Sequence, residues 1–178
     1  MANSVEKRAT VRGMFNRIAP TYDLLNHLLS FGIDRRWRKA TIQLLKLRRD
    51  SVLLDLACGT GDLSEEATKH EVRTIFAVDP SRQMLHRAEA KLRYNTTRCY
   101  FLESFGEELP LKDNLCSHAM IAFGIRNVAE RNYAFKEIYR VLKPGGYFAI
   151  LEFTPMEKKS PHSFLIFIFK KFYLPLAL

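Results

Sequence analysis

Several features of exported or metal-dependent proteins are missing from this sequence of 178 residues. Its three cysteines, Cys58, Cys99 and Cys116, form no Cys-x-x-Cys pair and have no histidine at metal-ligand spacing, which favours free thiols over disulfides or a metal site. Its apolar runs are far shorter than the roughly 18 residues that span a bilayer, and its N-terminus lacks the apolar core of a secretion signal. We therefore expect a cytoplasmic protein with no metal and no membrane-spanning segment.

Signatures of nucleic-acid binding are missing as well. There is no zinc-finger spacing, no RNA-recognition signature and no internal repeat. Lysine and arginine nevertheless exceed aspartate and glutamate by 28 to 19, which gives a formal net charge of +9. This excess suits an anionic partner, either a nucleic acid or an acidic membrane face, without choosing between them. Because the basic residues are dispersed, solvated helix faces explain most of them.

The pattern of apolar residues predicts one α/β domain. A chain of 178 residues with 47% hydrophobic content suffices for one buried core and is short for two. Helical periodicity over 4–46 predicts two or three helices, the first broken by Pro20. Beyond them, strands are predicted at 51–56, 74–78, 98–102, 116–123 and 147–152, and helices at 62–70, 81–92 and 128–142. This alternation is typical of a parallel sheet covered on both faces, with a helix lacking only between the third and fourth strands.

A small-residue turn follows the first predicted strand in the stretch LLDLACGTGDL, at 53–63. Gly59 and Gly61 allow a tight turn and a close approach of the backbone to a ligand. Asp79 ends the second predicted strand, where a carboxylate can accept both ribose hydroxyls of an adenosine. Each feature alone is as readily an ordinary turn or cap. Together they predict a nucleotide site at the carboxyl ends of the strands.

Two residues of this turn depart from the dinucleotide fingerprint Gly-x-Gly-x-x-Gly. Ser64 stands where the third glycine belongs, and Asp62 opens the following helix. A carboxylate there would repel a pyrophosphate, so a nicotinamide-dependent oxidoreductase is disfavoured. A cationic ligand without phosphate fits better, and S-adenosylmethionine is such a ligand.

The N-terminal leader and five further segments resemble a known family in order and spacing. They are MFNRIAPTYDLLNHLLSFGIDRRWR, LLDLACGTGDL, AVDPSRQML, EELPL, IAFGIRNV and YRVLKPGGYFAILEF. They resemble class I methyltransferases and, more closely, the ubiquinone/menaquinone biosynthesis C-methyltransferase family. The resemblance implies a Rossmann-like doubly wound sheet with an N-terminal helical lid. It also implies S-adenosylmethionine-dependent methylation of a ring carbon in a prenylated quinol, either demethylmenaquinol or the benzoquinol precursor of ubiquinone.

The resemblance carries a set of cofactor-binding residues onto this chain: Asp55, Gly59, Thr60, Gly61, Asp79, Phe105, Gly106 and Ala122. Two positions depart from the family pattern. Phe105 and Gly106 stand where an aspartate or asparagine followed by alanine is usual, and Ala122 replaces a small polar residue. Either the affinity for the cofactor suffers, or Phe105 stacks on the adenine.

Catalytic roles are implied for three residues. Arg126 would stabilise a phenolate electrostatically, Asn127 would orient the ring oxygen, and Tyr22 would close over the site from the leader. The residues alone also fit a surface ion pair between Arg126 and Glu130 and a helix cap at Asn127. Asp23 and His27 of the leader are the other polar residues expected near the site. His118 and Trp37 are expected in the core.

The division of the chain follows from the same resemblance. Residues 1–50 are expected to form the lid, 51–153 the core that binds S-adenosylmethionine, and 154–178 an incomplete C-terminal region. Family members continue with a further helix and terminal strands, so we expect a fragment or a truncated product whose fifth strand is an uncovered edge. The aromatic and basic segment near the C-terminus then favours association or a peripheral contact with the inner membrane face.

Other functions stay open at this point. One alternative is methylation of another small molecule or of nucleic acid, and another is a non-catalytic scaffold. The Asn/Asp-Pro-Pro-Tyr tetrad of amino-group methyltransferases is absent, because residues 122–125 occupy its place with Ala-Phe-Gly-Ile. We therefore expect no nucleic-acid partner. The sequence does not decide between a naphthoquinol and a benzoquinol, nor does it give the oligomeric state.

Overall fold

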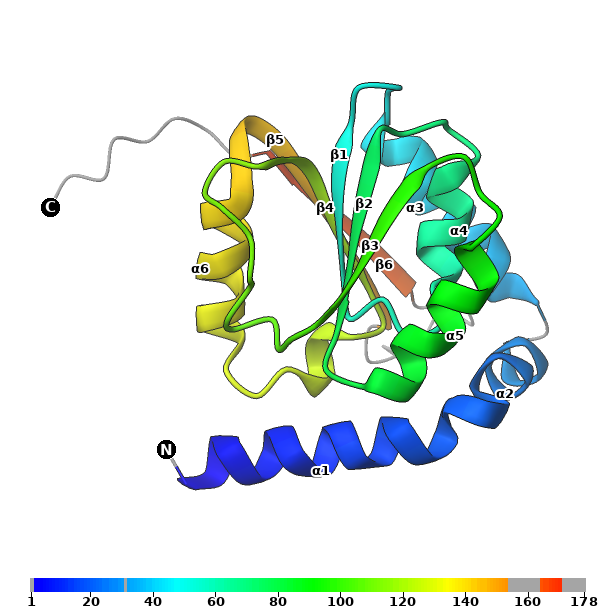
Figure 1. The fold of residues 1–178 in the computed structure, drawn as a ribbon, viewed down its shortest axis with the longest axis vertical. Coiled ribbons are helices and arrows are strands. Elements are labelled where there is room, and N and C mark those ends of the chain that lie inside the picture. The colour runs from blue at the N-terminus through cyan, green and yellow to red at the C-terminus, as the bar shows by residue number, and fades with distance from the viewer. Residues whose placement is uncertain (1, 31, 154–163, 171–178) are drawn as a thin grey trace, which may run out of the picture.

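A computed structural model describes residues 2–30, 32–153 and 164–170 of the chain (Figure 1). The leader forms α1 (Ala2–Ile18), the 3-10 turn η1 (Ala19–Thr21), α2 (Tyr22–Leu29) and α3 (Ile33–Leu45). The predicted helical leader is confirmed, and Pro20 lies in the turn that separates α1 from α2. Proline suits that position because it has no N–H to donate into a continuing helix.

The rest of the chain forms a sheet in the strand order β3-β2-β1-β4-β5-β6. The strands are β1 (Val52–Leu56), β2 (Thr74–Asp79), β3 (Arg98–Glu103), β4 (Cys116–Ala122), β5 (Leu142–Phe153) and β6 (Phe164–Lys170). The intervening helices are α4 (Asp62–Thr68), α5 (Arg82–Leu92) and α6 (Arg131–Val141), with a 3-10 turn η2 (Ile125–Asn127) after β4. The first five strands pair in parallel, which confirms the predicted α/β fold.

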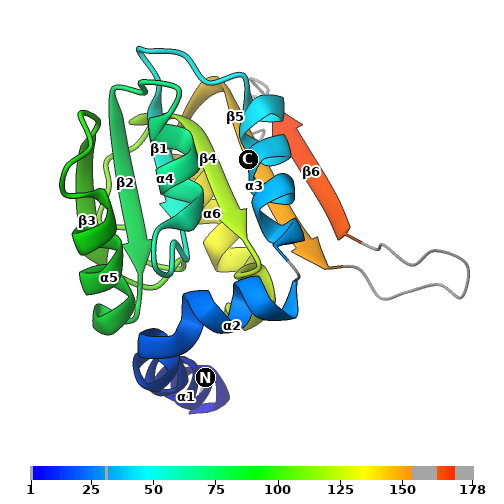
Figure 2. The ribbon, with the colours of Figure 1, turned by 90° about the vertical axis from the view of Figure 1, so that its right-hand side faces the viewer.

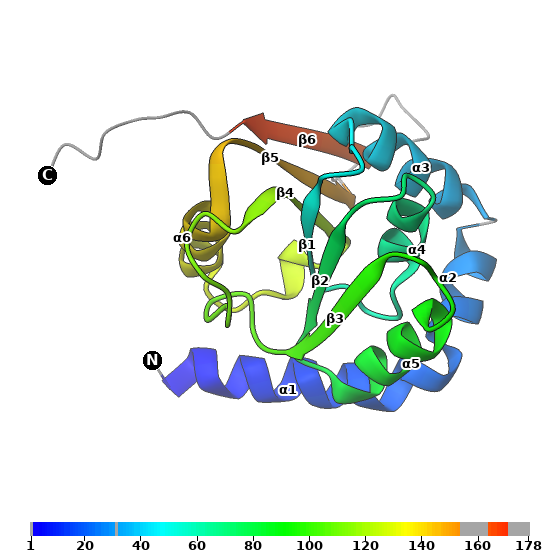
Figure 3. The same cartoon turned by 45° about the horizontal axis from the view of Figure 1, so that its top comes forward.

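Leu53 and Leu54 of β1 show how both faces of the sheet become covered. Successive strand residues point to opposite faces, and both leucines are 0% exposed. Leu54 packs in a cluster with Ile138 and Val141 of α6, whereas Leu53 packs with residues of α3, α4 and α5. Figure 1 and Figure 3 show the same layers, with α6 on one side of the sheet and α3 to α5 on the other.

Two predicted boundaries around α6 are wrong. The sequence predicts a helix over 128–142, but α6 begins at Arg131, because Ile125–Asn127 forms a separate turn and Val128 is extended. The predicted strand over 147–152 begins earlier, at Leu142, since Leu142 already pairs with Cys116 of β4. An irregularity of register beside Cys116 accommodates the additional residues.

β6 corrects the expectation about the outer edge of the sheet. It pairs antiparallel with β5, from Phe164 opposite Phe153 to Lys170 opposite Tyr147. The prediction that the fifth strand is an uncovered edge is therefore wrong. The segment FLIFIFK forms a strand because its isoleucines and phenylalanines favour a pleated sheet and β5 offers a row of backbone groups to pair with. The other parts of the C-terminal region, 154–163 and 171–178, lie outside the described residues.

The leader helices α1 and α2 lie across the end of the sheet at which the parallel strands terminate (Figure 2). Asn16 of α1 accepts hydrogen bonds from the Ser81 hydroxyl (2.7 Å) and the Gln83 N–H (3.3 Å). The Lys7 ammonium donates to the Val128 carbonyl at 3.0 Å. Since open parallel sheets bind ligands beyond the carboxyl ends of their strands, these contacts fasten the leader over the expected site.

Candidate active site

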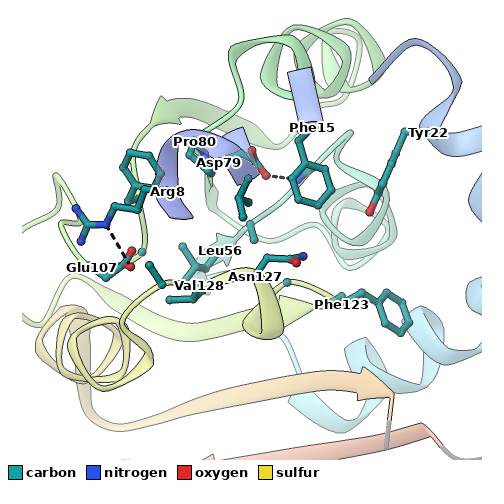
Figure 4. A pocket seen from close by; sticks show the side chains of 18 residues that line it. Arg8, Phe15, Tyr22, Leu56, Asp79, Pro80, Glu107, Phe123, Asn127 and Val128 are labelled. Atoms are coloured by element: carbon teal, nitrogen blue, oxygen red, sulfur yellow. Dashed lines mark hydrogen bonds and ion pairs between the residues drawn. The ribbon is translucent and has the colours of Figure 1, made fainter. Parts of the chain in front are cut away.

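A cleft lies between the leader and the strand ends (Figure 4), and it encloses about 670 Å³ with its open mouth included. One face of α1 lines it through Arg8, Val11 and Phe15, which recur at helical spacing, and Tyr22 of α2 adds to this wall. The opposite wall comes from the ends of β1 to β4 and the loops after them: Leu56, Ala57, Gly59, Asp79, Pro80, Phe105, Gly106, Glu107, Ala122, Phe123, Gly124, Asn127, Val128 and Ala129. The cleft therefore occupies the place where this class of sheet binds ligands.

The turn after β1 has an unusual backbone. Ala57, Gly59 and Gly61 all adopt positive φ angles, of 53°, 56° and 84°. A side chain at Gly59 would point toward the cleft, because a Cβ built there lies 3.8 Å from Tyr22 Cε1. A Cβ at Gly61 would instead lie 3.0 Å from Ala88 Cβ of α5. Gly59 thus keeps the cleft open, whereas Gly61 permits close packing of the turn on α5.

Asp79 holds this turn in place from the end of β2. Its Oδ2 accepts the Gly59 N–H at 2.9 Å, and its Oδ1 accepts the Ser81 N–H at 2.8 Å. Burial raises the pKa of Asp79 to about 6, although both N–H bonds oppose the rise. A carboxylate oxygen can accept more than one hydrogen bond, so Asp79 can still accept ligand hydroxyls at the wall of the cleft.

Asp55 lies beneath the turn and does not line the cleft. It is 1% exposed, and its Oδ2 accepts the Ser64 hydroxyl at 2.6 Å. Burial raises the pKa of Asp55 to about 7, against the opposing effect of the Ser64 bond. Ser64, which stands where a dinucleotide fingerprint has glycine, therefore supplies the hydrogen bond that Asp55 needs in the interior.

Thr60 connects the turn to the leader. It is 2% exposed, and its hydroxyl donates to Oδ1 of Asp23 in α2 at 2.5 Å. The other oxygen of Asp23 accepts from the Lys91 ammonium of α5 at 3.0 Å. The structure therefore brings Asp23 of the leader to the turn after β1 and commits the Thr60 hydroxyl to the protein itself.

Asp62 does not face the cleft as a lone carboxylate. It forms an ion pair with Lys91, and the Arg38 guanidinium lies 3.3 Å from its second oxygen. Two cations thus compensate its charge on the side of α4 that faces α3 and α5. The prediction that Asp62 favours a cationic ligand is therefore wrong, because two cations of the protein already compensate its charge and Asp62 does not line the cleft.

Phe105 and Gly106 line the far end of the cleft together with Glu107. The Arg8 guanidinium lies over the Phe105 ring, 5.2 Å from its centroid. Arg8 also pairs with Glu108 at 2.6 Å and approaches the buried Glu107 carboxylate at 3.4 Å. The leader therefore covers an aromatic face where the family pattern has a polar residue.

The three proposed catalytic residues do not lie together. Tyr22 and Asn127 line the cleft, and Figure 4 shows Asn127 between Leu56 and Phe123. The Arg126 side chain is 51% exposed, donates to Glu152 Oε1 at 2.9 Å and does not line the cleft. The sequence also allowed an ion pair between Arg126 and Glu130, but in the structure Arg126 pairs with Glu152 instead. The cap is not formed by Asn127, since α6 begins after Glu130.

Two residues expected in the core are placed by the structure. His118 is 8% exposed, stacks on Tyr147 and lies 2.9 Å from the Ser117 hydroxyl. Burial lowers the pKa of His118, so the neutral imidazole is favoured. Trp37 packs against Phe123, with ring centroids 6.1 Å apart. The His27 side chain lies outside the described residues.

Comparison with known proteins identifies the chain at the level of its family. Residues 1–177 match the model of the ubiE/COQ5 methyltransferase family. The chain belongs to this family. Its resemblance to the ubiquinone/menaquinone biosynthesis C-methyltransferases, drawn from the leader and the motifs, is confirmed.

Relatives in this family extend over a greater length. The chain is 49% identical over 144 residues to a ubiquinone/menaquinone biosynthesis C-methyltransferase UbiE of Syntrophotalea carbinolica, with 80% of this chain and 61% of the relative covered. It is 42% identical over 163 residues to the protein of the same name from Campylobacter jejuni, with 86% and 68% covered. A SAM-dependent methyltransferase from Aquifex aeolicus shares the fold, with a TM-score of 0.60 at 23% identity over 70% of this chain and 68% of that one.

In this member of the family, several residues of the site have no signal in the sequence. Arg8 and Phe15 carry helical periodicity that reads as ordinary packing, and nothing marks Glu107 as buried. Lys91 reads as a solvated helix residue, yet it bridges two carboxylates. These roles depend on contacts across 29 to 100 residues of chain, which motifs within one segment do not reveal.

Within the described residues, no helix is long and apolar enough to cross a membrane.

Proposed function

We propose that the chain is an S-adenosylmethionine-dependent C-methyltransferase that acts on the ring of a prenylated quinol in menaquinone or ubiquinone biosynthesis. The substrate is demethylmenaquinol or the benzoquinol precursor of ubiquinone. One observation carries the proposal. A single cleft presents a buried strand-end carboxylate, Asp79, beside the Gly59 turn, and two uncharged polar groups, Tyr22 and Asn127, near the same turn. Membership of the family supports this assignment.

The residues present fit the cofactor. Gly59 leaves room that a side chain would fill, and Asp79 offers buried acceptor oxygens for ribose hydroxyls. Phe105 and Gly106 would hold the adenine, by stacking and through the Gly106 backbone. Ala122 would supply an apolar wall, while Thr60, Asp55 and Gly61 would support the turn. When bound, S-adenosylmethionine supplies the electrophilic methyl group.

The chemistry requires a ring carbon held about 3 to 3.5 Å from the methyl and made nucleophilic by loss or sharing of a phenolic proton. Asn127 would orient the ring oxygen through its amide, and the Tyr22 hydroxyl would hydrogen-bond to the ring from the leader. Arg126 would contribute positive charge, because a guanidinium is a poor proton acceptor but stabilises a phenolate. The roof of α1 would exclude water from the reacting groups.

The division of labour along the chain follows from this cleft. We propose that 1–50 act as the lid and 51–153 as the cofactor-binding core, with 154–178 as the beginning of a C-terminal region.

The prenylated substrate also favours a peripheral contact with the inner face of a membrane. The exposed Leu24 and Leu25 of α2 and the exposed Arg35 and Arg36 of α3 support such a contact. Sedimentation with anionic and neutral vesicles tests it, and equal recovery from both would contradict it.

Transfer of labelled methyl groups tests the proposed reaction. The chain is incubated with labelled S-adenosylmethionine and, separately, demethylmenaquinol, the benzoquinol precursor or RNA. Label is expected in the quinol extract, and the Tyr22→Phe variant is expected to transfer about 10- to 100-fold more slowly, as for loss of a hydrogen bond to a charged group. Tyr94→Phe, whose side chain is 89% exposed, is the matched control. Label on RNA alone, or no binding of the cofactor, would overturn the proposal.

A further inference from the structure

A cluster of charged residues outside the cleft joins the leader to the turn at 57–61 after β1, which is the cofactor turn of the proposed function. Asp23 of α2, Asp62 at the start of α4 and Lys91 of α5 meet at one point, where the Lys91 ammonium contacts both carboxylates. The side chains are only 34%, 11% and 21% exposed. These three helices come from segments that are far apart in the sequence. Their charged groups therefore link the lid to the two elements that flank the turn.

The electrostatics of the cluster depend on Lys91. Two carboxylates approach the same ammonium, and without it they would repel each other in a partly buried place. Arg38 contacts Asp62 at 3.3 Å and also pairs with the buried Asp34, so it serves the far side of the cluster. The two carboxylates raise the pKa of Lys91 against the effect of burial, and it stays charged.

The position of Asp23 decides the position of its neighbour Tyr22. Asp23 accepts from Thr60 at 2.5 Å and from Lys91 at 3.0 Å, which fixes the first turn of α2 against the cofactor turn. Tyr22 then lies in the cleft, with its Cε1 3.8 Å from the Cβ position of Gly59 and its ring edge-on to Phe15. An Asp23 that moves away from Thr60 would carry Tyr22 with it.

We propose that Lys91 is a positioning residue for the methyl transfer: by holding Asp23 against Thr60, it seats α2 and Tyr22 over the bound cofactor. This inference rests on the proposed function. Lys91 acts through Asp23 and touches neither cofactor nor substrate. The lid is therefore coupled to the cofactor turn by an ion pair that the motifs of the sequence do not contain.

Cofactor affinity and turnover of Lys91→Met test the proposal, with Lys69→Met as the matched control. Lys69 forms a similar pair with Glu66 on the surface and is 64% exposed. We expect Lys91→Met to bind S-adenosylmethionine about 5- to 10-fold more weakly and to lose at least 10-fold in kcat at saturating cofactor, and Lys69→Met to match the parent chain. Lys91→Arg, which keeps the charge, should restore most of the loss. Parent values of Kd and kcat for Lys91→Met would overturn the proposal.

A second variant separates the role of Lys91 from a loss of folding, and a second readout measures cofactor binding without the quinol. Asp23→Asn leaves Lys91 and its pair with Asp62 in place and should also weaken cofactor binding and lower kcat, and the double variant should be no worse than Lys91→Met alone, because Lys91→Met already breaks the link to Asp23. Additive losses would overturn the proposal. The single tryptophan of the chain, Trp37, lies on α3 beside Phe123 of the cleft, so its fluorescence reports cofactor binding without any substrate. Failure of the parent chain to bind would contradict the proposed function, whereas equal binding by parent and Lys91→Met would contradict only the role of Lys91.

Discussion

The Asp79 carboxylate accepts the Gly59 N–H at 2.9 Å and thereby ties the end of β2 to the turn after β1. Both residues face the cleft, so the bond that shapes the turn also presents the carboxylate to a ligand. The hydrogen bond from the Gly59 N–H also constrains the ligand, because it occupies one acceptor site of Asp79. Asp79 keeps further lone pairs at the wall of the cleft, to which ribose hydroxyls would donate.

Cofactor affinity should depend on the charge of Asp79. Because its pKa is raised to about 6, the carboxylate becomes protonated as the pH falls through that value, and protonated Asp79 accepts hydrogen bonds less well. We expect the Kd for S-adenosylmethionine to rise below pH 6 and to be steady above pH 7. Calorimetric titration at several pH values measures it.

Asp79→Asn supplies the control for that dependence. It should bind about 10- to 100-fold more weakly at pH 8, the range expected for losing hydrogen bonds to a charged group. Its affinity should also lose the change near pH 6. A variant that keeps the same pH profile would assign the dependence to another group.

Gly61→Ala should destabilise the fold more than the same change at Gly145. Both glycines have positive φ, 84° and 76°, so both substitutions incur a backbone cost of about 1 to 2 kcal/mol. Only at Gly61 does the new Cβ meet a neighbour, Ala88 Cβ at 3.0 Å, which adds about 1 to 3 kcal/mol of overpacking. Urea unfolding of the two variants measures the difference. Equal losses would show that the turn can move away from α5.

Phe105→Leu should weaken cofactor binding, because it removes the ring that would stack on the adenine and that the Arg8 guanidinium covers. An aromatic contact is worth about 0.5 to 1.5 kcal/mol beyond buried area, so the Kd should rise about two- to ten-fold. Phe135→Leu, on the exposed surface of α6, should leave the Kd unchanged. If Phe105→Leu binds as well as the parent chain, adenine is held by other groups and the departure from the family pattern has another reason.

The sequence was sufficient for the first five strands in outline and for the turn, but not for the start of β5, for β6 or for the way in which the leader meets the sheet. Leu53 and Leu54 lie in an apolar run that only a strand buried on both faces explains, and Gly59 and Asp79 follow strands at recognisable spacing. The Lys91 bridge and the pair of Arg8 with Glu108 join segments 68 and 100 residues apart, and such pairings depend on packing that no local pattern encodes. Asp62 shows the same limit, since its helix-start position suggested a ligand contact while its partners lie on α3 and α5.

Arg126 should affect turnover and not cofactor binding. The Arg126 side chain is 51% exposed whereas that of Glu152 is 15% exposed, so this pair costs more to break than a fully exposed one, and Arg126 would leave Glu152 only for a strong negative charge such as a phenolate on the quinol. Arg126→Met should therefore lower kcat about 10- to 100-fold, as for loss of a charged stabilising group, with the Kd for S-adenosylmethionine unchanged. Arg131→Met, an exposed position at the start of α6, is the control. Glu152→Gln keeps the shape of the partner and should retain or raise kcat, because it releases the guanidinium. An Arg126→Met variant with the parent kcat would mean that the pair with Glu152 is structural, and that Tyr22 and Asn127 act on the ring without its charge.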